Sequence, residues 1–107
     1  MRDLQAAPRD RSAWIKIMPD NIIWRMSNGG TIGWTVHNKQ LIRKEGTYNE
    51  LSHQWAKHHT SAVAYGVTQF NCSIEIEDNG VRGVYSTLCI EEGEPTYRYV
   101  RIRNGRL

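Results

Sequence analysis

The sequence predicts an α+β fold, in which an antiparallel sheet of five or six strands carries one helix, at about 48–59, on its apolar face. Three observations lead to this prediction. Apolar and polar residues alternate with a period of two in several segments, as strands require. Turn residues, chiefly Asn-Gly steps, separate those segments. One segment, TYNELSHQWAKHH, has the spacing of a helical face instead.

The composition indicates one folded domain. The chain has 107 residues, of which 39% are hydrophobic and 23% charged, and this is enough for a single modest core. Residues 1–12 are polar and basic and are expected to form a flexible arm, followed by a single α+β domain over 13–107. The net charge of +3 allows a polyanionic partner without requiring one.

The first strand is expected in SAWIKIM, where Ala13, Ile15 and Ile17 share one face. Trp14 and Lys16 then occupy the other face. A turn at Pro19-Asp20-Asn21 follows, since Pro fixes φ and Asp and Asn close local hydrogen bonds.

The next stretch, NIIWRMSNGGTIGWTV, predicts a hairpin with a three-residue loop at 28–30. That loop length sets Trp24 opposite Trp34, whereas a two-residue loop would send the two rings to opposite faces. The apolar residues then share one face: Ile22, Trp24, Met26, Ile32, Trp34 and Val36. The tryptophans are therefore expected in the core. Arg25, Thr35 and His37 are expected on the outer face, where Arg25 and His37 are candidate binding residues.

The helix is predicted from a capping box and a periodic face. Thr47 followed by Glu50 matches S/T-x-x-E at a helix start. Tyr48, Leu51, Trp55 and either His58 or His59 recur at helical spacing. We expect this helix to lie across the sheet.

The rest of the chain reads as strands. VTQFNCSIEIE alternates strictly, Asp78-Asn79-Gly80 is a hairpin signal, and VRGVYSTLCIEE returns as the partner strand. After a turn at Glu92-Gly93-Glu94-Pro95, TYRYVRIR forms the last strand. The expected order is β-β-β-α-β-β-β with mostly antiparallel neighbours.

Cys72 and Cys89 flank the second hairpin, and two readings stay open for them. A two-residue turn leaves the thiols on one face but two residues out of register, while a shifted loop or a bulge at Gly83 would set them opposite each other. A disulfide, slightly favoured, would imply an oxidising compartment. Otherwise both are small buried hydrophobes.

The sequence favours no catalytic, metal or cofactor site. His53 and His58 are five residues apart, unlike the i, i+4 pair of H-E-x-x-H, and no C-x-x-C occurs. Neither cysteine has an electropositive loop to activate it. We therefore expect a protein that is not an enzyme and has no metal or cofactor.

The compartment stays open between two readings. No apolar run of about 18 residues could span a membrane, and the charged start lacks a signal-peptide pattern. The protein is either cytoplasmic or had a leader removed. Export is favoured if Cys72 and Cys89 are bridged.

The last strand carries the best candidate binding residues. Tyr97, Tyr99, Arg101 and Arg103 fall on one face of TYRYVRIRNGRL. Such a stripe can anchor a protein partner or stack bases and contact phosphates. It can also be a solvated face whose arginines pair with Glu75 or Glu77.

Three segments resemble the surface-adhesin protein E-like domain of bacteria: Phe70-Asn71-Cys72, Tyr85-Ser86-Thr87 and Glu91-Glu92-Gly93-Glu94. The resemblance spans about 13–100. It implies an exported or lipid-anchored small domain with a central antiparallel sheet that binds host extracellular proteins. The chain departs from that pattern in lacking a leader and a lipobox cysteine, in having Asn71 where Asp is common, and in its predicted tryptophan-bearing helix.

These observations predict a small non-enzymatic binding module of bacterial or phage origin that engages a protein partner, adhesin-like if it is exported. The alternative is a nucleic-acid-binding protein that uses the tyrosine–arginine strand together with the basic amino-terminal arm.

Overall fold

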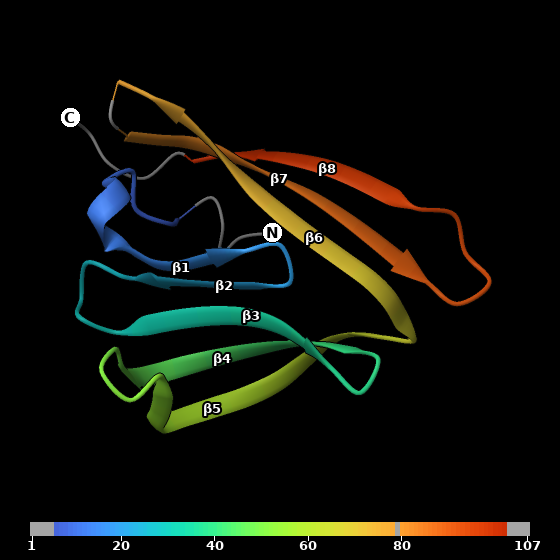
Figure 1. Cartoon of the computed structure of the whole chain (residues 1–107), viewed down its shortest axis with the longest axis horizontal. Coiled ribbons are helices and arrows are strands. Elements are labelled where there is room, and N and C mark those ends of the chain that lie inside the picture. Colours follow the sequence, from blue (N-terminus) through green and yellow to red (C-terminus); the bar gives the residue numbers. More distant parts are fainter. Residues whose placement is uncertain (1–5, 79, 103–107) are drawn as a thin grey trace.

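Two antiparallel sheets make up the fold of the computed structural model, which describes residues 6–78 and 80–102 (Figure 1). The first sheet has the strand order β1-β2-β3-β4-β5 and the second has the order β6-β7-β8. The elements are a short 3-10 helix η1 (Arg11–Ala13), β1 (Trp14–Met18), β2 (Asn21–Arg25), β3 (Thr31–His37), β4 (Gln40–Asn49), β5 (Gln54–Tyr65), β6 (Val67–Glu77), β7 (Gly80–Ile90) and β8 (Thr96–Arg101).

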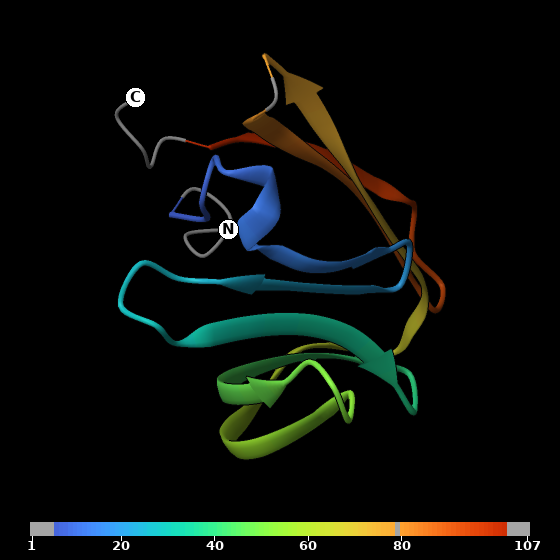
Figure 2. The same cartoon turned by 60° about the vertical axis from the view of Figure 1, so that its left-hand side comes forward.

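The strands of the three-stranded sheet run obliquely to those of the five-stranded sheet (Figures 1 and 2). The β4–β5 hairpin lies on the side of the molecule away from β7 and β8. Backbone hydrogen bonds join β6, an edge strand of the second sheet, to two turns of the first sheet. The Cys72 N–H donates to the Pro19 carbonyl at 2.7 Å, and the Val67 N–H donates to the Lys39 carbonyl at 2.8 Å. The chain therefore closes around one core between the sheets.

The inner faces of both sheets supply that core. Trp24 and Ile22 are fully buried and Trp34 is 4% exposed. The Trp24 ring lies 5.3 Å from Trp14 in the same sheet, and the Trp34 ring lies 6.3 Å from Phe70 in the other sheet. The prediction that both hairpin tryptophans belong to the core is confirmed.

The predicted register of that hairpin is wrong by two residues. Trp24 pairs with Ile32 and Ile22 pairs with Trp34. The loop has three residues, as predicted, but it lies one residue earlier in the chain, at 27–29, because the Met26 N–H bonds to the Gly30 carbonyl at 2.7 Å. A shift of two residues keeps every side chain on its predicted face.

A bulge in β1 also changes the prediction for the first strand. Trp14 pairs with Trp24, while Lys16 pairs with Ile23, so Ile15 is an extra residue. Trp14 therefore turns into the core, with its indole N–H bonded to the Pro8 carbonyl at 2.9 Å. Its predicted position on the face of Lys16 is wrong.

The predicted α+β class and the helix at 48–59 are wrong. Among the described residues the only helical segment is η1, and the predicted helix consists of the end of β4, a turn and the start of β5. The Asn49 side chain accepts the N–H groups of Leu51 and Ser52 at 2.9 and 3.1 Å, and His53 has a left-handed φ of 58°. This is an Asx turn rather than a helix cap.

The helical spacing of the aromatic residues has a different origin. Tyr48 and Trp55 pair across the hairpin, with their rings 5.2 Å apart in a T-shaped contact. A separation of seven residues fits both a helical face and two strands joined by a short turn. Leu51, which lies between Tyr48 and Trp55 in the proposed helical face, is 95% exposed.

Part of the expected amino-terminal arm contacts the second sheet. Ala7 is fully buried, the Arg9 carbonyl accepts the Val81 N–H at 2.6 Å, and Asp10 forms a β-bridge with Gly80. Residues 1–5 of the arm lie outside the described residues. These contacts attach the segment before η1 to the start of β7.

Cys72 and Cys89 are both free, so the favoured disulfide is wrong. Cys72 pairs with Ser86 while Cys89 pairs with Gln69, which places the two thiols on opposite faces of the hairpin. A bulge at Arg82 causes this, since it shifts the register by one residue and so reverses the face of everything beyond it on β7. The argument for an oxidising compartment falls with the disulfide.

Replacing Trp24 by Ala should lower the free energy of unfolding by about 3–5 kcal/mol, because a fully buried ring leaves a cavity. Chemical denaturation measures this. Leu51→Ala is the control and should change stability by less than about 0.5 kcal/mol. Equal losses in both variants would contradict the assigned core.

Burial raises the pKa of the Cys72 thiol from its ordinary 9.0 to about 12. In that pH interval the unfolded chain loses a proton that the folded chain keeps, so the free energy of unfolding falls as pH rises. The Cys72→Ala variant lacks this titrating thiol. Denaturation at a series of pH values above 9.0 should therefore give a steeper decline in the wild type than in Cys72→Ala, and identical slopes would show that the thiol is not desolvated.

Candidate functional site

Strands β7 and β8 place three tyrosines on the outer surface of the three-stranded sheet. Tyr85 pairs with Tyr99, and Tyr97 follows two residues away on the same face. Their exposed fractions are 48% for Tyr85, 75% for Tyr97 and 41% for Tyr99. We call this surface, together with Glu75 and Arg101, the tyrosine face.

Glu75 on β6 holds two of the tyrosines. Its carboxylate accepts the Tyr99 hydroxyl at 2.9 Å and the Tyr85 hydroxyl at 3.0 Å. The two rings lie 4.7 Å apart. A Cβ on Gly83 would lie 2.3 Å from the Tyr99 hydroxyl oxygen, so only glycine there lets the ring lie across β7.

Charges on this face are largely compensated. The hydrogen bonds from Tyr99 and then Tyr85 lower the pKa of Glu75, and Arg82 and Arg101 contribute in the same direction. Desolvation raises the pKa of Tyr99, with its bond to Glu75 adding to the effect. Arg82 bridges two carboxylates, since it lies 2.7 Å from Glu77 and 3.6 Å from Glu75.

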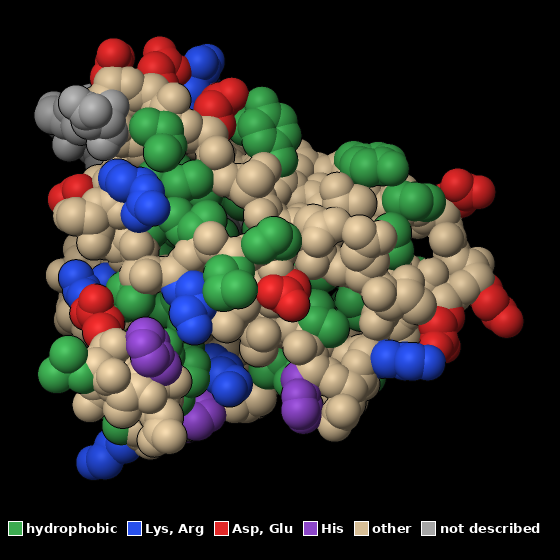
Figure 3. Space-filling view, viewed as in Figure 1, with side chains coloured by type: hydrophobic (Ala, Val, Ile, Leu, Met, Phe, Trp, Pro, Cys, Tyr) green, Lys and Arg blue, Asp and Glu red, His purple; other side chains and the backbone are tan. Residues whose placement is uncertain are grey.

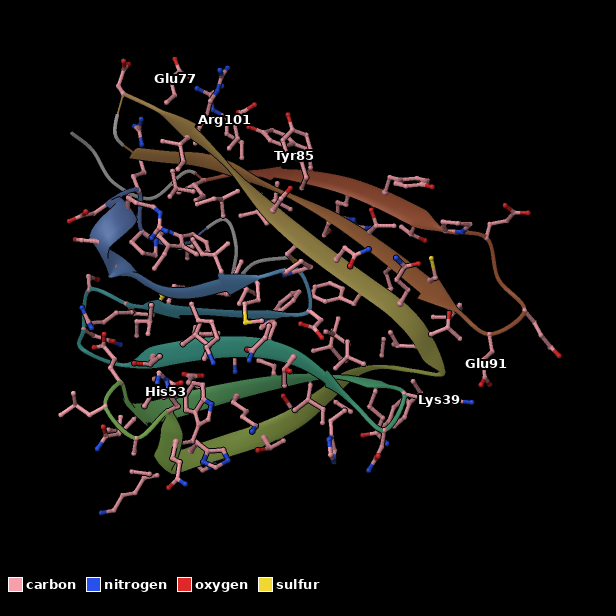
Figure 4. The ribbon with its side chains drawn as sticks, in the orientation of Figure 1. Lys39, His53, Glu77, Tyr85, Glu91 and Arg101 are labelled. Atoms are coloured by element: carbon pink, nitrogen blue, oxygen red, sulfur yellow. The ribbon has the colours of Figure 1, made fainter. Side chains whose placement is uncertain are left out.

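Tyr97 differs from the other two tyrosines because it is the most exposed. Beside it lies a shallow hollow of about 270 Å³. The hollow is lined by Tyr85, Ser86, Thr87, Tyr97, Arg98 and Tyr99. The predicted placement of Tyr97, Tyr99 and Arg101 on one face is confirmed by the register, and Figure 4 shows Tyr85, Glu77 and Arg101 at this side of the molecule. Arg103, the fourth predicted residue, lies outside the described residues.

The structure does not bring Arg25 and His37 to the tyrosine face. Both belong to the other sheet, at the ends of β2 and β3. Arg25 forms an ion pair with Glu50 in the β4–β5 turn. The predicted binding residues therefore divide between two surfaces.

His37 lines a second and larger hollow, which we call the histidine cleft. It has a volume of about 530 Å³ on the outer face of the five-stranded sheet. Its lining consists of Lys16, Asn21, Ile23, Thr35, Val36, His37, Ile42, Lys44, Tyr48, His53, Trp55, His58 and Thr60. Figure 3 shows histidine, lysine and arginine side chains gathered at the β4–β5 end, and Figure 4 places His53 near the hairpin tip.

Comparison with known proteins assigns no function to these surfaces. No protein-family model matches the chain, and no curated protein matches it. The resemblance to the surface-adhesin protein E-like domain therefore stays a prediction.

Sequence reasoning missed the histidine cleft because it assigned the wrong secondary structure. On a helix His53 and His58 would lie about 140° apart, whereas in the hairpin both line the hollow that His37 also lines. The available signal was Asn49, a residue that favours turns over helix interiors. Given that turn, Tyr48 and Trp55 become cross-strand partners.

A third hollow, of about 380 Å³, lies between the two sheets. Its apolar lining includes Trp34, Leu41, Phe70 and Leu88, so it continues the core. Arg43 also lines it and pairs with Glu45 at 2.9 Å. This hollow is an opening of the core rather than a separate surface.

Residues 6–78 and 80–102 contain neither a cluster of metal ligands nor a membrane-spanning helix. No group of three or more His, Cys, Asp or Glu side chains is arranged to hold a metal ion. No helix among the same residues has the length and apolarity needed to cross a membrane.

Removing both hydroxyls in Tyr85→Phe/Tyr99→Phe should raise the pKa of Glu75, because those hydrogen bonds lower it. Carboxyl NMR titration measures the change. Tyr97→Phe is the matched control and should leave the Glu75 titration as in the wild type. A Glu75 titration that is the same in the double variant would show that the hydroxyls do not hold the carboxylate in solution.

Proposed function

We propose that this protein is a small non-enzymatic binding module that engages a protein partner through the tyrosine face. The observation that carries the proposal is the row of three exposed tyrosines, two of which are held in place by one carboxylate. Tyrosine and arginine are enriched among the residues that dominate protein–protein interfaces.

Preorganisation supports the use of Tyr85 and Tyr99 as anchors. Their hydroxyls are already bonded to Glu75 and their rings contact each other. Ordering a side chain during association costs about 0.5–1.5 kcal/mol, and these two rings avoid most of that cost. Tyr97 extends the apolar surface beside them, with the hollow next to it available to a partner side chain.

The edge of β8 adds a second contact mode. Within the described residues β8 pairs only with β7, so its other edge has no strand beside it. An extended segment of a partner could add to this edge by backbone hydrogen bonds. Val100 on β8 is buried, which keeps the strand anchored while Tyr97 and Tyr99 face outward.

The same face is poorly suited to nucleic acid. Glu75 and Glu77 lie on β6 next to the tyrosines, and they engage Arg82. Because Arg82 is already paired with these carboxylates, it is not free to bind a phosphate backbone, while a protein partner can complement charges of both signs.

The test is to place a photo-crosslinking residue at position 97 and identify by mass spectrometry what it captures from an extract of the source organism. Position 65 is the matched control, since Tyr65 is 70% exposed on β5 of the other sheet. The purified captured protein should then bind the wild type, and Tyr97→Ala or Arg101→Ala should weaken binding by about tenfold or more, with the melting temperature unchanged.

Three results would contradict the proposal. Equal capture from positions 97 and 65 would show that the tyrosine face is not special. A collapse of the melting temperature in Arg101→Ala would make that residue structural. Tight, steeply salt-dependent binding of single-stranded RNA or DNA that Tyr97→Ala abolishes would assign the face to nucleic acid.

A further inference from the structure

The histidine cleft is a built hollow rather than a gap between loops. Trp55 reaches from β5 across the sheet, and a Cβ added to Gly33 on β3 would lie 2.7 Å from its ring. Tyr48 and His58 pack against the same ring at centroid distances of 5.2 and 5.7 Å. The curled β4–β5 hairpin thus forms an aromatic wall, and strands β2, β3 and β4 form the floor.

The size of the cleft suits a small molecule. Its volume of about 530 Å³ falls within the range of about 300–1,000 Å³ that is typical of ligand sites. Ile42 and Trp55 line it and are partly exposed, so it offers apolar surface as well as polar groups. Ile23 is only 3% exposed, which shows how far the wall covers the sheet.

The lining of the cleft contains positively charged lysine side chains and no negatively charged ones. Lys16 and Lys44 line the cleft from β1 and β4, and its lining contains no carboxylate. Among the described residues neither lysine forms an ion pair, whereas Arg25, on the same face of the sheet, pairs with Glu50. Two uncompensated ammonium groups in one hollow attract an anion.

Further donors point to an oxygen-rich group. His37, His53 and His58 add ring nitrogens to the lining. The Tyr48 hydroxyl is buried and has no hydrogen-bond partner within the described part of the chain. An unsatisfied buried hydroxyl destabilises the fold, and a ligand oxygen that reached it would supply the missing hydrogen bond.

We propose that the histidine cleft binds a small organic anion that joins a phosphate or sulfate group to a flat ring. Lys16 and Lys44 bind the anionic group, and the wall of Trp55 and Tyr48 packs against the ring. This site is independent of the tyrosine face, because it lies on the outer surface of the other sheet. Its failure would leave the proposed protein-binding function untouched.

The test uses AMP as the probe and follows the indole N–H signals of the four tryptophans by NMR. AMP should shift the Trp55 signal and leave those of Trp14, Trp24 and Trp34, which are buried in the core. Adenosine, which lacks the phosphate, and inorganic phosphate, which lacks the ring, should each bind at least about tenfold more weakly. Indoxyl sulfate in place of AMP tells a sulfate ligand from a phosphate ligand.

Charge variants locate the site. Lys16→Gln/Lys44→Gln should weaken AMP binding by about tenfold or more, because charge-assisted hydrogen bonds are lost. Lys44→Arg should retain most of the affinity. Lys57→Gln is the matched control, since Lys57 is exposed on β5 but does not line the cleft, and it should bind AMP like the wild type.

Several outcomes would overturn the proposal. If neither AMP nor indoxyl sulfate shifts the Trp55 signal, this class of ligand is excluded. Equal weakening by Lys57→Gln would show attraction to net charge alone, and adenosine binding as tightly as AMP would remove the anionic group from recognition. Thermal melting of each variant confirms that a loss of binding is not a loss of fold.

Discussion

The packing of Trp24 and Trp34 beneath the three-stranded sheet is the interaction on which the rest of the structure depends. Trp34 meets Phe70 across the two sheets at 6.3 Å, and Trp24 is fully buried. Once these rings point inward, strict alternation sends His37 and Lys44 to the outer face of their sheet. A slip of one residue would bury the charged side chains and expose the tryptophans, so the core determines which residues are available for binding.

Bulges then adjust that alternation at particular positions. Without the bulge at Arg82, Glu75 would lie opposite Arg82 instead of Gly83. Gly83 is the residue that gives the Tyr99 ring room to lie across β7 and reach Glu75. The same bulge separates Cys72 from Cys89. One inserted residue therefore accounts both for the ordered tyrosine face and for the free thiols.

Much of the sheet could be predicted from the sequence, because turn residues and period-two alternation are local signals. The faces of Trp24 and Trp34 follow from alternation alone, and so does the shared face of Tyr97 and Tyr99. Register could not be predicted, since it depends on the loop that closes at Met26 and Gly30 and on the bulge at Arg82. Packing against the opposite sheet determines the position of that loop and of that bulge.

The helix prediction failed for a related reason. Short apolar spacings do not distinguish a helical face from a hairpin whose aromatic residues meet across a turn. The packing of the Trp55 ring over Gly33 is a tertiary contact, and no short window around the hairpin contains both residues. The histidine cleft was hidden by this error, because its wall is the hairpin itself.

The two candidate surfaces differ in charge as well as in position. On the tyrosine face, Arg82 and Arg101 offset the charges of Glu75 and Glu77, so the face has no excess positive charge to attract a free anion. The histidine cleft has Lys16 and Lys44 and no carboxylate in its lining. Because the core lies between the two sheets, a ligand in the cleft leaves the tyrosines uncovered. The fold thus places the proposed protein-binding surface and the proposed anion-binding cleft on different sheets. The carboxylates of the first therefore do not compete with an anion for the lysines of the second.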